Sequence, residues 1–445
     1  MPRLLLTAAL LLALAGPAAA QTPRDKKVRD DKAKVEAAGY WIYNDLPKAL
    51  AEAKATGKPV VAVLRCIPCE ECVKLDDELV DTDEALKPLL AQYVRVRIVS
   101  ANGLDLSLFQ FDTDQSFAVF MFNADGTIYG RFGTRSDRTN WIGDVSLLGM
   151  AKALKGGLDL HAGYAARSAG AAVPPGLAAK RGPAPLFPVP ERFPTLTKYG
   201  SGIDYAGKVV QSCIHCHQIG DANRDHLWKQ GPLPEEVLFP YPHPKALGLI
   251  FDPRETATVL RVEKGSPAEV AGFKAGDAIR AMNGQTLLSI ADVQWVLHRT
   301  PAAGGTVEAE VQRGGKKMEF DWKLPAGWRR ADDLSWRASS WGYRRMATGG
   351  ILLNALPAGE RPAGVPAAGM ALLAKHVGEF GPHATAKNAG FKKDDVIVSF
   401  DGRTDLLRET DVLAHVLTAK RPGDAVAVRV VRAGRPLDLK LPVQP

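Results

Sequence analysis

Cysteine is scarce in this sequence, and its placement is more informative than its number. The 445 residues contain five cysteines, which all fall in two short groups, residues 66–72 and 213–217. No cysteine is left elsewhere to link distant parts of the chain, which argues against a fold held together by scattered disulfides. Thiols gathered in this way favour redox chemistry or metal binding.

The sequence also lacks a long apolar run beyond its first residues. Arg3, the apolar stretch 4–15 and the small residues up to Ala20 are typical of a signal peptide over residues 1–20, with an uncleaved anchor as the alternative. No later stretch approaches the ~20 apolar residues that span a bilayer. We therefore expect a periplasmic or otherwise exported protein with no membrane span after signal cleavage, in a compartment where disulfides persist.

A strong excess of one charge is missing as well. Lysine and arginine number 57 and aspartate and glutamate 49, which gives a formal net charge of +8. Basic residues are interleaved with acidic ones instead of forming a patch. We therefore expect the charge to serve solubility, and we expect no nucleic-acid partner.

The length of the chain allows about three domains. Residues 38–164 alternate between helical and buried-strand patterns, which predicts an α/β domain. Its predicted elements are a helix over 45–56, strands over 59–64 and 93–99, a hairpin over 117–132 and a helix over 144–155. Residues 165–194 are rich in Ala, Gly and Pro and predict an extended linker. Residues 195–244 form a short segment around the second cysteine group.

The remainder of the chain contains a weak internal repeat. Residues 265–279 recur as residues 383–397, and each copy continues into a strand, a turn, a helix and two alternating strands. This shared order predicts two β-rich modules, over residues 245–326 and 350–445. A tryptophan-rich connection over residues 327–349 lies between them.

The first cysteine group, Cys66-Ile-Pro-Cys69-Glu-Glu-Cys72, stands between the predicted strand 59–64 and a helical pattern. Because the N-terminus of a helix stabilises a thiolate, Cys69 is placed to react. Cys72, one turn later, is placed to resolve a mixed disulfide. The alternatives are a pairing of Cys66 with Cys69, an inert disulfide, and a metal site made by the three thiolates.

Residues 45–134 resemble the thioredoxin-like family called thioredoxin-7. The resemblance is carried by the leading helix at Ala49–Ala53, the sequence Gly57-Lys-Pro59, the buried strand and the cysteines that precede a helix. It implies a thioredoxin-like fold in which Cys69 is the attacking thiol and Cys72 the resolving thiol.

The second group, Cys213-Ile-His-Cys216-His217, has the spacing at which two thiols attach haem covalently. It resembles the motif of c-type cytochromes, which implies haem c attached through Cys213 and Cys216, with His217 as an iron ligand. Candidates for the sixth ligand are His226 and His243, with Met282 behind them. A disulfide with an incidental histidine and a zinc site are the alternatives.

The repeat resembles PDZ domains of the bacterial type attached to periplasmic proteases, through the sequence Ser266–Asp277, Ile279 and the turn Asn283-Gly284. The resemblance implies binding of protein or peptide C-termini by a backbone nest beside a groove helix, here residues 289–298. The expected peptide-binding residues are Leu247, Gly248 and Leu249 of the nest, with Ile250 and Ile290 of the apolar pocket.

The second copy departs from this pattern. Gly369-Met370 stands where the nest loop is expected, and Asp394 replaces the glycine found at Gly276. We therefore expect a structural module. Neither copy is accompanied by a Gly-x-Ser-x-Gly nucleophile motif, so we expect binding modules and not a protease.

The combination resembles exported bacterial proteins in which a thioredoxin-7 domain precedes PDZ domains, some with selenocysteine at a redox position. It predicts a multidomain protein of α/β and β-rich parts: a thioredoxin-like domain, a short haem-binding-like segment and two PDZ-like domains. The expected function is thiol and haem redox chemistry with a thiol or electron-transfer partner, and the candidate activity is thiol–disulfide oxidoreductase. The alternatives are a binding scaffold with structural disulfides and a metal-handling protein that uses Cys66, Cys69 and Cys72.

Overall fold

The computed structural model describes residues 22–67, 83–115, 117–137, 143–167 and 170–445. The predicted dithiol residues Cys69 and Cys72 lie outside the described residues. Among the described helices, none is both long and apolar enough to cross a bilayer.

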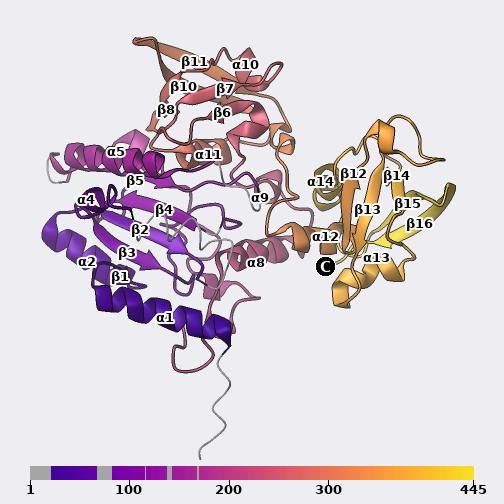
Figure 1. Cartoon of the computed structure of the whole chain (residues 1–445), viewed down its shortest axis with the longest axis horizontal. Coiled ribbons are helices and arrows are strands. Elements are labelled where there is room, and N and C mark those ends of the chain that lie inside the picture. Colours follow the sequence, from indigo (N-terminus) through magenta and orange to yellow (C-terminus); the bar gives the residue numbers. More distant parts are fainter. Residues whose placement is uncertain (1–21, 68–82, 116, 138–142, 168–169) are drawn as a thin grey trace, which may run out of the picture.

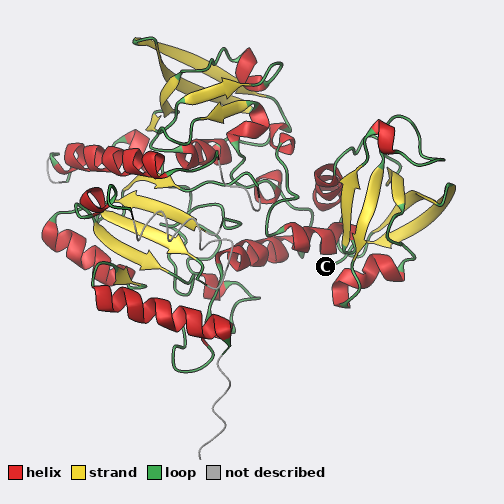
Figure 2. Cartoon of the chain, viewed as in Figure 1, coloured by secondary structure: helices red, strands yellow, loops and turns green. Residues whose placement is uncertain are grey.

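A five-stranded sheet in the order β1-β3-β2-β4-β5 forms the centre of the α/β domain (Figures 1 and 2). β3 runs parallel to β2, whereas β4 runs antiparallel to both β2 and β5. The strands are β1 (Ile42–Tyr43), β2 (Val60–Arg65), β3 (Val94–Ile98), β4 (Phe117–Phe122) and β5 (Ile128–Phe132). The predicted strands and hairpin are therefore confirmed.

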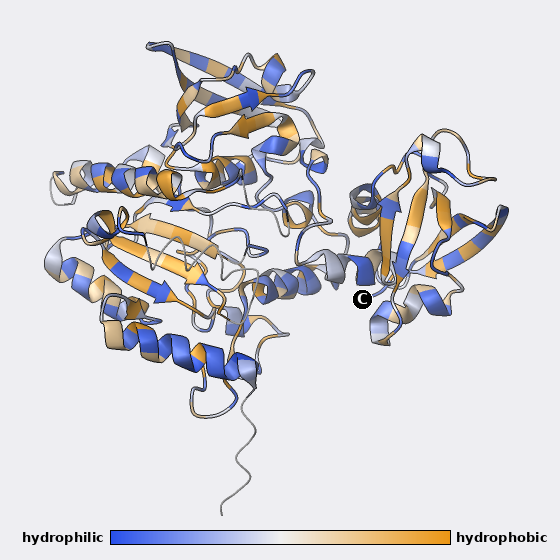
Figure 3. Ribbon diagram, in the orientation of Figure 1, coloured by the Kyte–Doolittle hydropathy of each residue, from blue (hydrophilic) through white to orange (hydrophobic). Residues whose placement is uncertain are grey.

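β2 is buried along its whole length, as its unbroken apolar sequence predicts. Its side chains alternate between two apolar clusters. One contains Val60 and Ala62 together with residues of α2 (Leu46–Thr56), and the other contains Val61 and Val63 together with residues of α5 (Leu147–Ala165). Figure 3 shows the apolar strands of this sheet and the largely hydrophilic α1 (Pro23–Ala38) at its edge.

Helix α5 continues well past the predicted end at residue 155. The prediction was wrong because two glycines follow, and glycine usually weakens a helix. Here Gly157 is needed for packing: a Cβ at this position would lie 2.5 Å from the Tyr93 hydroxyl of the sheet. The missing side chain thus lets the helix approach the sheet closely.

The two repeat copies have the same order of elements. The first module contains β6 (Leu249–Phe251), β7 (Val259–Val262), α10 (Pro267–Val270), β8 (Ala278–Met282), β9 (Gln285–Thr286), α11 (Ile290–Arg299), β10 (Gly305–Arg313) and β11 (Lys316–Leu324). The second contains β12 (Ile351–Ala355), β13 (Leu372–Val377), α13 (Thr385–Asn388), β14 (Val396–Phe400), α14 (Glu409–Ala419), β15 (Ala425–Arg432) and β16 (Arg435–Pro442).

This order corrects the placement of the second nest loop. Gly369-Met370 lies between β12 and β13, whereas the loop that matches Gly248 precedes β12 and contains Gly349 and Gly350. The expected position was one strand too late because residues 356–371, between β12 and β13, form a long insertion without an equivalent in the first module.

Helix α8 (Cys216–Trp228) joins the α/β domain to the second module (Figure 1). Near its start, Ile219 and Ala222 belong to the apolar cluster of the α/β sheet. At its end, Trp228 is fully buried in the core of the second module, where its indole donates a 2.7 Å hydrogen bond to the Gln444 carbonyl. Residues 195–244 are therefore divided between two larger cores and do not form a core of their own.

The predicted linker over residues 165–194 is packed and not freely extended. It includes the short helices α6 (Pro175–Ala178) and η2 (Pro190–Arg192). Lys180 is fully buried and lies 3.1 Å from Asp292 of α11, and the Trp295 indole donates to the Ala179 carbonyl at 3.0 Å. Small residues in this segment let it lie flat between the α/β domain and the first module.

The tryptophan-rich connection contains α12 (Ser340–Thr348) and packs against the α/β domain. Its Arg337 is buried and forms ion pairs with Asp112 at 2.7 Å and with Asp332 at 3.4 Å. Burial raises the pKa of Asp112 to about 6, although the Arg337 guanidinium acts in the opposite direction. The Arg337 guanidinium therefore joins the acidic loop to the connection and partly offsets the effect of burial on Asp112.

Arg337→Met tests this junction. Removal of one partner leaves buried carboxylates without a counter-charge, so we expect a loss of about 3–5 kcal/mol in the free energy of unfolding. Urea unfolding followed by circular dichroism measures it. Arg429→Met, which breaks the exposed pair of Arg429 with Asp438, is the control and should leave the curve unchanged. Equal effects of the two variants would contradict the proposed junction.

Candidate functional site

Cys66, the described cysteine of the first group, meets the second group at the end of the central strand of the α/β domain. Cys66 directly follows β2, and its Sγ lies 3.0 Å from Nδ1 of His215, which is 149 residues away in the sequence. This contact joins the buried Cys66 thiol to the middle histidine of the Cys-Ile-His-Cys-His motif. The sequence had pointed to His217 and gave no indication of His215.

The loop after β3 positions the second cysteine group. The Asn102 amide donates to the Ser212 carbonyl at 2.9 Å, and its oxygen accepts from the Ile214 N–H at 2.8 Å. The Ala101 N–H donates to the Ile214 carbonyl at 2.9 Å. Asn102 thus fixes the backbone on both sides of Cys213. Its only signal in the sequence was a polar residue three positions after the predicted strand 93–99.

Cys213 is a deeply buried thiol. It is 4% exposed, and burial raises its pKa to about 11, while a hydrogen bond with Ser100 acts in the opposite direction. A thiol in this state is protonated at neutral pH and reacts slowly. Cys213 is therefore a poor candidate for the attacking thiol.

Cys216 occupies a different environment at the first position of α8. His215 caps this helix, and its N–H donates to the Gln218 side chain at 2.8 Å. The Cys216 side chain packs against the apolar cluster of the α/β sheet. Cys66, His215 and Cys216 all line one cavity of about 10 Å³, which is room for about one water molecule.

The described residues around this motif do not fit a haem. The ring needs a cavity that both thiols and the iron-binding imidazole reach, but Cys213 is buried and the cavity at Cys216 is far smaller than a haem. His217 is 48% exposed and lies 3.1 Å from Asp221 on its own helix. Covalent haem therefore remains a prediction from the motif alone.

The candidate sixth ligands are also poorly placed. His226 lies nine residues after His217 on α8, so about 13 Å separates the two along the axis, too far for opposite faces of one iron. His243 is buried beside Asp144 at 3.6 Å, and burial lowers its pKa to about 4. Met282 is fully buried in the core of the first module.

Metal binding has little support in the described part of the chain. No three His, Cys, Asp or Glu side chains come together there as a ligand set. The predicted three-thiolate site includes Cys69 and Cys72, which are outside the described residues.

The structure brings together the predicted peptide-binding residues of the first module. Leu247 ends η3 (Pro244–Leu247), Gly248 follows, and Leu249 starts β6, beside α11 with Ile290. Gly248 has a φ of +78°, and a Cβ there would lie 2.2 Å from the Ser266 side chain, so only glycine fits. Ile250 and Ile290 are 6% and 4% exposed, and Ile290 belongs to the apolar core of the first module.

The matching position of the second module is filled by a buried ion pair. Glu409, at the start of α14, accepts a 2.8 Å hydrogen bond from the Leu353 N–H of β12 and pairs with Arg344 of α12 at 2.6 Å. The Leu353 N–H, which faces α14 from β12, thereby has a hydrogen-bond acceptor within the chain. The arrangement is consistent with the predicted structural role of this module.

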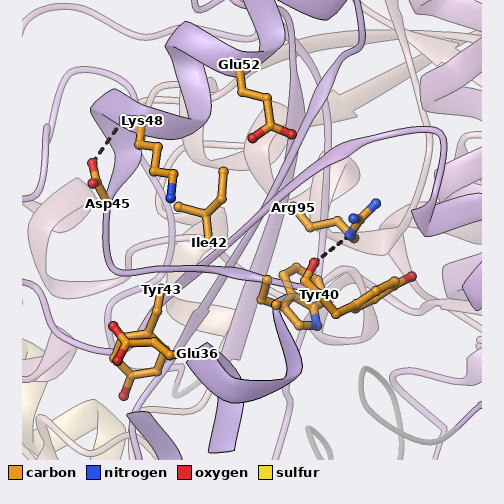
Figure 4. Close-up of a pocket in the computed structure, with 10 residues that line it drawn as sticks. Glu36, Tyr40, Ile42, Tyr43, Asp45, Lys48, Glu52 and Arg95 are labelled. Atoms are coloured by element: carbon orange, nitrogen blue, oxygen red, sulfur yellow. Dashed lines mark hydrogen bonds between the residues drawn. The ribbon is translucent and has the colours of Figure 1, made fainter. Parts of the chain in front are cut away.

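A separate cavity of about 420 Å³ lies at the β1 edge of the sheet (Figure 4). Charges of both signs surround it, and the Arg95 Nε donates to the Tyr40 carbonyl at 2.8 Å. Its described lining contains neither cysteine nor histidine: Glu36, Gly39, Tyr40, Trp41, Ile42, Tyr43, Asp45, Lys48, Glu52 and Arg95. It is therefore distinct from the cysteine site.

Comparison with protein families agrees with this architecture. A thioredoxin-like family model, thioredoxin-7, matches residues 41–124, and a PDZ-domain model matches residues 245–324 and 376–443. The matched regions contain β2 and β3 of the α/β domain and most of both modules.

Relatives share parts of this chain. A probable periplasmic serine endoprotease DegP-like of Marinomonas sp. (strain MWYL1) is 29% identical over 194 residues, which cover 42% of this chain and 37% of that protein. A probable periplasmic serine protease do/HhoA-like of Haemophilus influenzae is 40% identical over 73 residues, 16% of each chain. The chain thus spans well under half of these curated relatives.

Among solved structures, the HtrA-type protease AlgW with decapeptide matches at 14% identity with a TM-score of 0.19. This match covers 31% of this chain and 49% of that chain.

Cys213 gives a test of the buried thiol site. With its pKa at about 11, the folded and reduced protein should alkylate at Cys213 roughly one hundredfold more slowly at pH 8 than the unfolded chain. The rate should rise as the pH approaches 11, because the thiolate fraction then increases. Iodoacetamide labelling followed by peptide mass spectrometry measures it. Labelling at the unfolded rate would show that Cys213 is accessible.

Proposed function

We propose that this protein, a thioredoxin-like domain joined to two PDZ domains, is an exported thiol–disulfide redox protein that recruits peptide or protein partners through its first PDZ domain. Cys69 and Cys72 are its proposed reactive dithiol. Cys66 and His215 are proposed to assist them from the end of β2.

The contact between Cys66 and His215 carries this proposal. An imidazole within hydrogen-bond distance of a thiol can accept its proton and thereby form a thiolate. The 3.0 Å contact supports such a role for His215, and it stands at the start of the cysteine sequence that matches a redox family. A purely structural disulfide framework would not need an imidazole at this position.

The proposed reaction is exchange with a disulfide of a partner protein. The Cys69 thiolate attacks one partner sulfur and releases the other, which leaves a mixed disulfide. Cys72 then attacks Cys69 and frees the second partner sulfur. The products are a Cys69–Cys72 disulfide and a partner dithiol, which takes up the two protons given up by the cysteines. The reverse sequence oxidises a partner.

The relatives support export and partner binding. Two of them are described as periplasmic, and this chain carries two PDZ domains of its own. Disulfides persist in that compartment, so an exchange protein has substrates there. PDZ domains bind peptide C-termini by adding them as a strand, which gives the redox site a means to hold a partner.

Catalysed reduction of oxidised insulin by dithiothreitol tests the redox proposal. Cys69→Ser and Cys72→Ser should each lower the catalysed rate by at least about tenfold, because one lacks the nucleophile and the other cannot release the partner. His215→Ala should lower it less and shift the activity to higher pH. His376→Ala, at an exposed histidine on β13, is the control. Full activity in both serine variants would contradict the proposed dithiol.

The absorption spectrum tests the haem prediction separately. We expect protein made together with a haem-maturation system to lack a haem band, because the described residues around Cys213 and Cys216 leave no room for the ring. A band that survives acid extraction would establish covalent haem and require a rearranged site. His217→Ala would then be expected to alter that band, while His376→Ala would not.

A further inference from the structure

The peptide groove of the first PDZ domain lies against the thioredoxin-like domain. Its walls are β6 and α11, and its end is the loop around Gly248. Among the described strands, β6 pairs only with β7, so its other edge is the one that an added peptide strand would use. Residues 131–137 and 143–149 of the thioredoxin-like domain, here called the covering residues, contact this groove at three places.

The first place is the groove helix. The Ser289 hydroxyl donates to the Arg131 carbonyl at 2.6 Å, and the Arg131 N–H donates to the Asp292 carboxylate at 3.2 Å. Further along α11, the Thr134 hydroxyl donates to the Gln294 side chain. The N-terminal half of α11 is therefore fixed to β5 and the residues after it.

The second place is the nest loop. Lys245, three residues before Gly248, forms an ion pair with Asp144 and donates to the Ser136 hydroxyl at 3.0 Å. Asp144 is 2% exposed and also accepts from the Ser136 N–H at 2.8 Å. An internal carboxylate thus stands beside the loop that is expected to receive the carboxylate of a peptide.

The third place is the end of β6. The Ser146 hydroxyl donates to the Pro253 carbonyl at 2.8 Å. One helical turn later, a Cβ at Gly149 would lie 2.2 Å from the same carbonyl oxygen. The start of α5 therefore contacts the backbone two residues beyond β6 as closely as a glycine allows.

We propose that the thioredoxin-like domain closes the peptide groove of the first PDZ domain, and that a peptide C-terminus binds only after the covering residues leave α11, Lys245 and β6. The fully buried pair of Lys180 with Asp292 adds a cost to opening, since both charges must regain water. Closed and open forms are then two discrete states, and partner binding is coupled to the position of the redox domain.

This inference rests on the peptide binding in the proposed function, and two helix variants test it. Gly149→Ala places a methyl group against the Pro253 carbonyl and should push α5 away from the groove. Gly163→Ala makes the same change near the other end of α5, where a Cβ meets nothing within 4 Å, and is the matched control. Both variants replace a glycine of α5 with alanine, so they differ only in whether the added methyl group meets the Pro253 carbonyl.

Hydrogen exchange of the full chain is the first measurement. Amides of β6 and α11 should exchange at least about tenfold faster in Gly149→Ala than in the wild type, with no change in Gly163→Ala. Thr134→Val, which removes the hydrogen bond to Gln294, should also speed the exchange of these amides. It replaces Gly149→Ala in the test if that variant does not fold. Unchanged exchange in folded Gly149→Ala and in Thr134→Val would overturn the closure.

The second measurement is peptide binding. The probe is a mixture of fluorescein-labelled decapeptides that are random at their last four positions and have free carboxyl ends. We expect Gly149→Ala to bind about tenfold more tightly than the wild type and Gly163→Ala, and amidated peptides to bind to none. Equal affinity of wild type and Gly149→Ala would overturn the closure and leave peptide recruitment standing. Faster exchange without binding by any variant would overturn peptide recruitment itself.

Discussion

Helix α8 is the element on which the remaining structure depends, because it begins in one core and ends in another. Its first turns pack on the thioredoxin-like sheet, and Trp228 fills the core of the second PDZ domain. Neither burial is available to an isolated segment of this size, so the helix and both domains stabilise one another. This constraint also sets the chemistry, since the residue that caps α8 is His215 and the first residue of the helix is Cys216.

Buried ion pairs join the domains at the other junctions. Arg337 ties the tryptophan-rich connection to the acidic loop after β3, and Lys180 meets Asp292 where the Ala/Gly/Pro segment passes the first PDZ domain. Such pairs add little net stability compared with apolar packing, but a mismatched arrangement is costly. They therefore favour one relative placement of the domains. That placement presents the cysteine groups to each other and closes the peptide groove.

The cysteine site and the groove lie at different strands of the same sheet. Cys66 follows β2 at the centre, whereas Arg131 of β5 contacts α11 at the far edge. The cysteine site and the groove thus share no residues, although both involve the thioredoxin-like domain. The second PDZ domain contains the buried pair of Glu409 and Arg344 beside β12 and provides the core into which Trp228 of α8 packs.

The sequence by itself determined the local elements and the domain types. The apolar run of β2, the alternation of the hairpin strands and the repeated PDZ pattern depend on neighbouring residues, and each was predictable. Helix α5 was predicted too short because the packing of Gly157 against Tyr93 cannot be read from spacing. Only the tertiary structure decided that Cys66 meets His215, since a contact across 149 residues leaves no local pattern. It also decided that the predicted groove is closed, because the residues that cover it belong to another domain.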